Sequence, residues 1–516
     1  MAWRHDAMRA GRDLSRCLEL DGVHRDLSFD ERHGLRVSLA TAKGPTCQHG
    51  DISEDSGNTI PVLELDKFPE DILHHILSLV PLRDAARAAC VSRRFLRSWR
   101  RFPNLTFNWE TVGLNFDKGP LYERAKKLAN RIHHILENHS GIEVKTLKLQ
   151  VRTCGDVIIA NHLDIWLRAA VKSGIVELAL DLPRIHNLRF NLSCSLISSV
   201  ASSLQSFSLS YCAFHPTLTI GLLRNVKNVC LTLVHITEEE LGCFLSCTTS
   251  LEKLEVSQCD DITCLKIPSH LQQLSILRVF LCRRLHMIEI NALSINNSSQ
   301  LRRMTMNGQC FSGMFQYALT KLQSIASNLQ SLTLLSSREC FNMPSLPDKF
   351  LHLRNLKIHC FVMENFDFFP LVSFLKACPA LESFFLLAGR HLDVRRDSIM
   401  HQYSDSSHTR RVAEVHQDNL KKVTITGFCS AKSLIELTWQ ILESSSSLQC
   451  LVLDTTSGYD NTGICNNMER KAVMEALRGV EAIKKYIKGK VPSRVNLEVL
   501  EPCGRCHIPN LHKPGR

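Results

Sequence analysis

The sequence predicts an α/β fold in which three short helices precede a repeat solenoid, a curved parallel sheet with helices on its outer side. Two observations predict it. An apolar spacing of the form L-x-x-L-x-L recurs twelve times between Val144 and Leu453, and a dense apolar segment, Leu65 to Trp99, lies before the first copy. Recurrence every ~20–29 residues is typical of solenoids, in which each unit buries its apolar face against its neighbours.

Composition sets the broad class of the chain. Its 516 residues are 44% hydrophobic and 22% charged, which is typical of globular protein with room for a long array. Residues 1–60 lack the apolar run of a secretory signal, and we expect a flexible, charged extension. The 21 cysteines lie singly, which favours a reducing nucleus or cytoplasm. The charge of +11 is dispersed, so we expect no nucleic-acid and no membrane partner.

The apolar segment predicts three helices. The first begins at Pro69, has Glu70 and Asp71 in its first turn, and ends before Pro81. Its apolar residues follow helical spacing and form a stripe: Ile72, Leu73, Ile76, Leu77 and Val80. A second helix is expected from Asp84 as N-cap, and a third over residues 92–99. Helices this short bury too little surface to be stable alone, so they need a partner surface.

The twelve copies predict the strands of the sheet. They begin at Val144, Ile175, Leu204, Val226, Leu251, Leu274, Leu301, Leu329, Leu353, Leu381, Leu420 and Leu448. The last two apolar residues of each copy share one face of a strand, while the residue between them points the other way. Thr237 to Ser250 is expected to form an outer helix with Thr237 as N-cap. The spacing is that of a leucine-rich repeat; the alternative is an ordinary α/β domain, which the number of copies disfavours.

One interval departs from this rhythm. Between the copies that begin at Leu381 and Leu420, residues 389–419 are polar, charged and poor in aliphatic side chains. We expect a long exposed loop there, either disordered or functional.

The segment "FPEDILHHILSLVPLRDAARAACVSRRFLRSW" closely resembles the F-box of plant proteins. The usual motif has Leu where Phe68 stands, Leu where Val80 stands and Trp where Phe95 stands, and all three are apolar exchanges. Towards the C-terminus, "HQDNLKKVTITGFCSAKSLIELTWQILESSSSLQCLVLDTT" resembles the FBD region that ends many plant F-box proteins with leucine-rich repeats, and "AIKKYIKGKVPSRVNLEVLEPCGRCH" is similar to the close of one such group.

The resemblance implies a domain layout and a function. The layout is an extension over 1–60, an F-box over 61–108, a helical linker or cap over 109–143, leucine-rich repeats over 144–410, FBD-like terminal repeats and cap over 411–507 and a tail over 508–516. The implied function is that of the substrate-recognition subunit of a Skp/cullin/F-box ubiquitin ligase. The F-box would dock on a Skp-type adaptor, which brings cullin and a RING protein, and the repeats would hold an unidentified protein target.

Two sets of residues are candidates for these contacts. Those expected to contact the adaptor are Leu65, Phe68, Pro69, Ile72, Leu73, Ile76, Leu77, Pro81, Leu82, Val91, Phe95 and Trp99. Those expected to contact the target are outward strand residues: Arg278, Phe280, Thr305, Lys357, His359 and Phe385. Their basic and aromatic character suits an acidic or phosphorylated partner, and a solvated face is the alternative.

The sequence offers no catalytic or cofactor motif. It has no P-loop and no nucleophile elbow. "CGRCH", from Cys503, supplies three zinc ligands where a structural site needs four, so we expect no metal and no cofactor. The expected protein is not an enzyme and acts by holding a target near the conjugating enzyme. Two alternatives are a receptor for a small molecule, with a deep ligand pocket in the repeats, and a repeat scaffold that delivers nothing for degradation.

Overall fold

The computed structural model describes residues 68–504 apart from internal gaps. The gaps are 91, 115–119, 141, 143, 153–156, 172–173, 185–189, 218–219, 291–299, 308–312, 337–348, 361–365, 390–396, 401–409, 413–414, 457–467 and 469. The predicted N-terminal extension, the tail and most of the "CGRCH" motif therefore lie outside the described residues. The chain from Leu65 onward forms one compact unit.

Within the described residues, fourteen strands form one sheet in which every neighbouring pair is parallel. In spatial order they are β1 (Asn104–Phe107), β2 (Thr146–Gln150), β3 (Glu177–Asp181), β5 (Ser206–Ser210), β7 (Asn228–Thr232), β8 (Lys253–Ser257), β10 (Ile276–Phe280), β12 (Arg303–Asn307), β13 (Ser331–Ser336), β14 (Asn355–Cys360), β15 (Ser383–Leu387), β16 (Lys422–Thr426), β17 (Cys450–Asp454) and β18 (Asn496–Leu500). The twelve predicted copies supply β2 to β17 of this sheet, and the expected parallel solenoid is confirmed.

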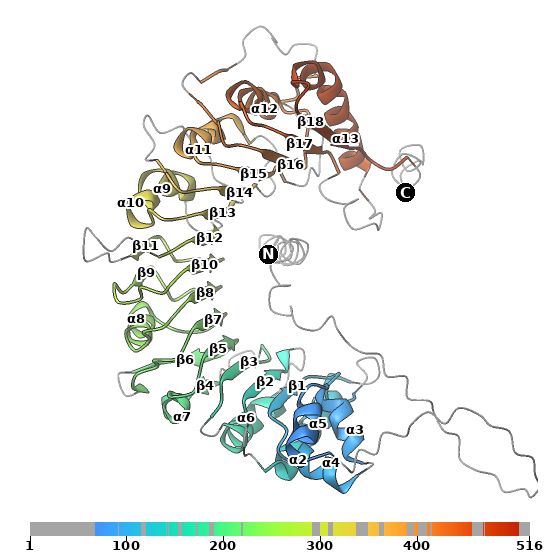
Figure 1. Cartoon of the computed structure of the whole chain (residues 1–516), viewed down its shortest axis with the longest axis vertical. Coiled ribbons are helices and arrows are strands. Elements are labelled where there is room, and N and C mark those ends of the chain that lie inside the picture. The colour runs from blue at the N-terminus through green and yellow to red at the C-terminus, as the bar shows by residue number, and fades with distance from the viewer. Residues whose placement is uncertain are drawn as a thin grey trace, which may run out of the picture. The chain divides into compact units, whose positions relative to one another are not determined.

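The connections between these strands carry the helices and two small sheets. The helices are α2 (Glu70–Ser78), α3 (Leu82–Ala89), α4 (Arg93–Trp99), α5 (Leu121–Asn138), α6 (Val157–Ala170), α7 (Cys194–Val200), α8 (Glu238–Ser246), α9 (Met314–Thr320), α10 (Leu322–Ile325), η5 (Phe369–Leu371), α11 (Val372–Ala377), α12 (Lys432–Ser444), α13 (Arg470–Ala482), η6 (Ile483–Ile487) and η7 (Lys488–Lys490). The small sheets pair β4 (Asn191–Leu192) with β6 (Ala213–Phe214) and β9 (Cys264–Ile267) with β11 (Met287–Ile290). Helices α6 to α12 follow one another along one face of the long sheet (Figure 1). None of the described helices has the length and apolar character needed to cross a membrane.

Most strands of the long sheet bury their second and fourth side chains, and β13 and β14 also bury their last two. In β3, β5 and β8, for example, the second and fourth residues are buried and the others are half-buried. The buried residues point to the helix-bearing side, where they form a continuous core with the helices. The first, third and fifth residues point to the opposite side, which we call the open face.

A left-handed turn follows several strands at the same position. Tyr211, Leu233, Gln258 and Leu281 each come directly after a strand and have φ between 52° and 61°, although none is glycine. The turn sends the next side chain into the core; Cys259, for example, is fully buried. Its thiol donates a hydrogen bond to the carbonyl of Leu231 in the preceding repeat, at 3.6 Å. The repeated turn therefore fixes how successive units stack.

The three N-terminal helices pack against the start of the sheet. Leu77, Leu82 and Trp99 share one hydrophobic core with Phe102 and Leu105, the latter in β1. The Nδ2 group of Asn104 donates a hydrogen bond to the carbonyl of Ser78, at 3.1 Å, which ties β1 to α2. Part of the partner surface that these helices need is therefore supplied by the chain itself, and the sheet begins inside the segment 61–108.

The local signals for helix starts are borne out with small shifts. The Ser92 hydroxyl accepts a hydrogen bond from the amide of Arg94, as an N-cap of α4 should. Thr237 is the N-cap of α8, as expected, and it forms a capping box with Glu240. Asp84, however, lies in the first turn of α3 and not at its N-cap, because Pro81 takes that position and α3 begins at Leu82.

Candidate functional site

Helix α2 carries two apolar stripes, and only one faces the core. Leu73 and Leu77 are 1% and 2% exposed, whereas Ile72 and Ile76 are 41% and 40% exposed. Leu79, directly after the helix, is 72% exposed. Ile72, Ile76 and Leu79 are spaced i, i+4, i+7 and so lie along one side of the helix. We call them the α2 stripe; large aliphatic side chains exposed in a row are typical of a docking surface.

The residues predicted to contact the adaptor thus fall into separate groups. Ile72, Ile76, Pro69 and Pro81 are exposed, and Phe68 and Phe95 are half-buried. Leu73, Leu77, Leu82 and Trp99 are buried, and the last three share the core that holds the helices on β1, so they offer little surface to a partner. Their contact with an adaptor stays a prediction. Leu65 and Val91 lie outside the described residues. Leu79 was missed, although its i+7 spacing from Ile72 was available in the sequence.

Polar contacts fix α2 against α4. The Arg97 guanidinium bonds to Oε1 of Glu70 through Nε at 2.9 Å and Nη2 at 2.7 Å. The Arg94 guanidinium donates to the carbonyl of Phe68, just before α2. The Arg97–Glu70 pair is exposed and contributes little free energy, but it sets the angle at which α2 presents its stripe.

The candidate target surface is the open face from β10 to β15. The strand register aligns third residues, so Arg278 lies beside Thr305, and Lys357 lies beside Phe385. The Lys357 ammonium is 5.9 Å from the centre of the Phe385 ring, and the His359 and Phe385 rings are 5.4 Å apart. The register therefore brings the six predicted residues onto one stretch of sheet.

Burial and ion pairing also divide the six residues predicted to contact the target. Phe280 and His359 are 6% and 4% exposed, so they support the surface and offer little area to a partner. Arg278 lies 3.5 Å from the Glu255 carboxylate on β8, which offsets its charge. Lys357 is exposed, and Thr305 and Phe385 are half-buried. Arg303 and Lys422, the exposed first residues of β12 and β16, are not among the predicted target contacts, because that prediction covers only the positions between and after the last two apolar residues of a copy.

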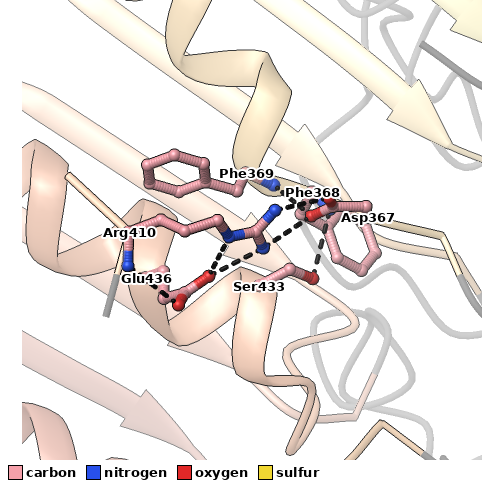
Figure 2. Close-up of polar contacts among 6 residues, drawn as sticks. All are labelled: Asp367, Phe368, Phe369, Arg410, Ser433 and Glu436. Atoms are coloured by element: carbon pink, nitrogen blue, oxygen red, sulfur yellow. Dashed lines mark hydrogen bonds and ion pairs between the residues drawn. The ribbon is translucent and has the colours of Figure 1, made fainter. Parts of the chain in front are cut away.

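A polar cluster anchors the far end of the inserted segment (Figure 2). The Arg410 guanidinium donates to both carboxylate oxygens of Asp367, at 2.6 and 2.9 Å, and to Oε2 of Glu436 on α12, at 2.8 Å. It also lies 4.6 Å from the centre of the Phe369 ring. Hydrogen bonds to Asp367 and Glu436 raise the pKa of Arg410 above its usual range, because both carboxylates favour the charged guanidinium.

The same cluster connects neighbouring elements. Ser433 on α12 accepts a hydrogen bond from the amide of Phe368, at 3.2 Å. The Glu436 side chain is almost fully buried, so Arg410 supplies the countercharge that its burial requires. We therefore assign the cluster a structural role: it fastens residue 410 to α12 and to the start of η5.

The described parts of the insertion correct the expectation of an exposed loop. Ile399 is 2% exposed, and its amide donates to the carbonyl of Ser430 at 2.8 Å. Gln417 is fully buried and its amide group donates to the carbonyl of Cys378 at 3.1 Å. These anchors were missed because isolated buried residues, whether apolar like Ile399 or polar like Gln417, carry no periodicity.

Within the described residues, no group of three or more His, Cys, Asp or Glu side chains is placed to hold a metal ion. Of the "CGRCH" motif only Cys503 and Gly504 are described, so the motif remains untested. The described cysteines are free thiols, most of them in strands or turns of the repeats. Burial raises the pKa of Cys212 to about 12 and that of Cys230 to about 11, which keeps both thiols protonated and unreactive at neutral pH.

Two family models match the chain. Residues 65–107 match the F-box domain. Residues 135–504, more than half of the chain, match the leucine-rich-repeat domain described as At1g61320/AtMIF1. The F-box match includes α2 with its stripe, and the second match includes the long parallel sheet from β2 to β18.

Curated relatives from Arabidopsis thaliana are similar over parts of their length. F-box protein At5g03100 is 21% identical over 209 residues, 40% of this chain and 60% of the relative. F-box/LRR-repeat protein At5g02910 is 23% identical over 306 residues, 54% of this chain and 61% of the relative. F-box/FBD/LRR-repeat protein At2g04230 is 25% identical over 198 residues, 37% of this chain and 42% of the relative. The chain thus spans about three-fifths of the length of the first two relatives.

Proposed function

The chain belongs to the family with an At1g61320/AtMIF1-type leucine-rich-repeat domain, here behind an F-box, and from this premise we propose that it is the substrate-recognition subunit of a Skp/cullin/F-box ubiquitin ligase. The F-box docks on a Skp-type adaptor, through which the chain reaches cullin and a RING protein. The open face of the repeats holds the protein target. The complex works in the nucleus or the cytoplasm.

The observation that carries the proposal is the α2 stripe. Ile72, Ile76 and Leu79 leave apolar surface exposed on a helix whose adjacent apolar stripe is already buried. Exposing such a row costs free energy that burial against a partner would recover, at ~25 cal/mol per Å². The stripe also lies within the part of the chain that matches the F-box.

In this function the chain performs no chemistry of its own. It would hold a target lysine near the charged conjugating enzyme, and so raise the effective concentration of the acceptor. The relatives with F-box and leucine-rich-repeat regions support this role, since they share the same two parts.

Substitution on the α2 stripe tests adaptor binding. We expect the double variant Ile72→Asp, Ile76→Asp to lose at least about a hundredfold in affinity for a purified Skp-type adaptor, because two carboxylates would be buried without partners. Isothermal calorimetry with the full chain measures the loss. Because both isoleucines are already exposed, the thermal midpoint of the variant should stay near that of the parent.

A matched variant controls for added charge on exposed apolar positions. Leu222 and Leu351 are 53% and 59% exposed and lie in the repeats. Leu222→Asp, Leu351→Asp should bind the adaptor as the parent does. Equal adaptor binding by both double variants would overturn the proposal.

The same variant separates target delivery from target binding. Deleting residues 65–101 would uncover Leu105 and Phe107 of β1, so the deletion would disturb the repeats. The Ile72→Asp, Ile76→Asp chain avoids this difficulty. Affinity purification of this variant under proteasome inhibition should recover the targets but not the adaptor or cullin. A second measurement compares target levels in cells with and without the protein. If the targets do not accumulate without it, the protein is a scaffold and not a ligase subunit.

A further inference from the structure

The open face changes its charge character between β10 and β16. From β1 to β8 the strand cations on this face lie beside carboxylates, in the pairs Lys148–Glu177 at 3.0 Å and Lys253–Glu255 at 3.3 Å. From β10 to β16 no carboxylate occupies the first, third or fifth position of a strand. On the open face, the strands from β10 to β16 therefore supply no carboxylate from their own residues; the next ones are Asp454 on β17 and Glu498 on β18.

Exposed cations gather on this stretch. Arg303 and Lys422 are the first residues of β12 and β16, and Lys357 is the third residue of β14. The residues immediately before the same three strands are also basic and exposed. We call the six the basic strip: Arg302, Arg303, Arg354, Lys357, Lys421 and Lys422.

One carboxylate lies among them. Glu382, just before β15, is 3.4 Å from the Arg354 guanidinium and 3.7 Å from the Lys421 ammonium. Within the described part of the chain, no carboxylate forms an ion pair with Arg302, Arg303, Lys357 or Lys422. The strip thus keeps an excess of positive charge on alternate strands of one sheet.

Resting on the proposed function, we infer that the basic strip binds an Asp/Glu-rich segment of the target. Neighbouring strands lie ~4.8 Å apart, so Arg303 on β12 and Lys422 on β16 are roughly 19 Å apart, with Lys357 between them. A peptide in the polyproline II conformation advances ~3.1 Å per residue and covers that span in about six residues. Its side chains three residues apart lie on one face, about 9.3 Å apart, so carboxylates at that spacing would meet successive cations. An apolar side chain would contact the half-buried Phe385 ring.

The arrangement favours carboxylates over the other anionic partners. Phosphate is typically held by several donors converging on one point, often bidentate arginines. Here the cations Arg303, Lys357 and Lys422 are spaced two strands apart and suit separate charges. Single-stranded nucleic acid needs exposed aromatic platforms for its bases, and the strip offers only the half-buried Phe385 among its described neighbours.

Peptide binding to the full chain tests the inference. The probe is a fluorescent ten-residue peptide with Glu at every third position and one Leu, and its partner is the same peptide with Gln for Glu. Fluorescence anisotropy should show the Glu peptide binding and weakening as salt rises. The triple variant Arg303→Ser, Lys357→Ser, Lys422→Ser should lower its affinity by about tenfold or more, since each exposed pair is worth up to ~1 kcal/mol.

Two controls make the outcome specific. The variant Lys126→Ser, Lys127→Ser, Arg168→Ser removes the same net charge from exposed positions on α5 and α6 and should bind the Glu peptide normally. Both triple variants should bind the Skp-type adaptor as the parent does, so failure at the strip is distinct from failure of the ligase function. Three results would overturn the inference. The first is equal weakening of Glu-peptide binding by both triple variants. The others are binding of a phosphoserine peptide without binding of the Glu peptide, and tighter binding of a single-stranded oligonucleotide than of the Glu peptide.

Discussion

At the scale of single residues, Arg410 shows how one side chain holds an otherwise irregular segment. It bonds to Glu436, whose side chain is 1% exposed, and to Asp367. Its neighbour Arg411 makes an ordinary exposed pair with Glu443, at 3.0 Å. The two adjacent arginines therefore differ in burial of the partner and not in charge.

This contrast predicts different costs for the same substitution. Arg410→Gln should lower the free energy of unfolding by about 1–3 kcal/mol, because Glu436 would stay buried without its countercharge; the half-exposure of Arg410 limits the loss. Arg411→Gln should cost less than ~0.5 kcal/mol. Urea unfolding followed by circular dichroism measures both, and equal losses would contradict the structural role of the cluster.

Buried thiols make stability depend on alkaline pH. Burial raises the pKa of Cys212 from 9.0 to about 12, so the folded chain keeps the proton while the unfolded chain releases it above pH 9. The stabilisation is complete below pH 9 and is lost as the pH rises towards 12. Cys212→Ala should therefore flatten the decline of the urea midpoint between pH 8.5 and about 10.5.

The matched control for this variant is Val234→Ala. Val234 is the buried residue after the left-handed turn of the next repeat, as Cys212 is in its own. It loses similar packing but no ionisable group. A pH slope in Cys212→Ala equal to that of Val234→Ala would show that the thiol does not contribute.

At the scale of elements, α13 is placed by a glycine and a buried acid. A Cβ at Gly479 would lie 2.9 Å from the carbonyl oxygen of Phe428 and 3.4 Å from the Cα of Cys429. Glu475, fully buried one turn earlier, accepts hydrogen bonds from the amide and hydroxyl of Ser430 at 3.0 and 2.7 Å. The helix therefore approaches the turn after β16 more closely than any residue with a side chain would allow.

Gly479→Ala should therefore reverse the usual effect of replacing a helical glycine. We expect a loss of about 1–3 kcal/mol in unfolding free energy, because the new methyl group meets backbone that has no room to move. In α8, Gly242 has no atom within 4 Å of an added Cβ, and Gly242→Ala should stabilise by up to ~1 kcal/mol. Thermal unfolding of the two variants checks the opposite signs.

The sequence predicts most elements of the sheet but not its two edges. Strand β1 follows Phe102 and contains Phe107, so aromatic residues stand where the repeat has aliphatic ones, within a segment read as F-box. Strand β18 has Arg494 where the first leucine of the repeat would stand. At an edge only one neighbour must be matched, so the repeat pattern relaxes there.

The candidate sites were predicted less completely than the fold, for a physical reason. Helix α2 has adjacent apolar stripes, and periodicity alone does not say which one the core takes. Contacts with Trp99, Phe102 and β1 decide it, and these come from distant parts of the chain. In the same way, the pairing of Arg278 with Glu255 depends on strand register.

At the scale of the whole molecule, the core that runs without a break from α2 through β1 into the repeats has a mechanical consequence. A hinge between the two binding regions would let a bound target sweep a wide volume, whereas a packed joint fixes the direction in which it is presented. Under the proposed function, the number of repeats between β1 and β12 then sets the distance between the α2 stripe and the basic strip. The lysines that become modified would be chosen by their reach from the strip and not by their sequence.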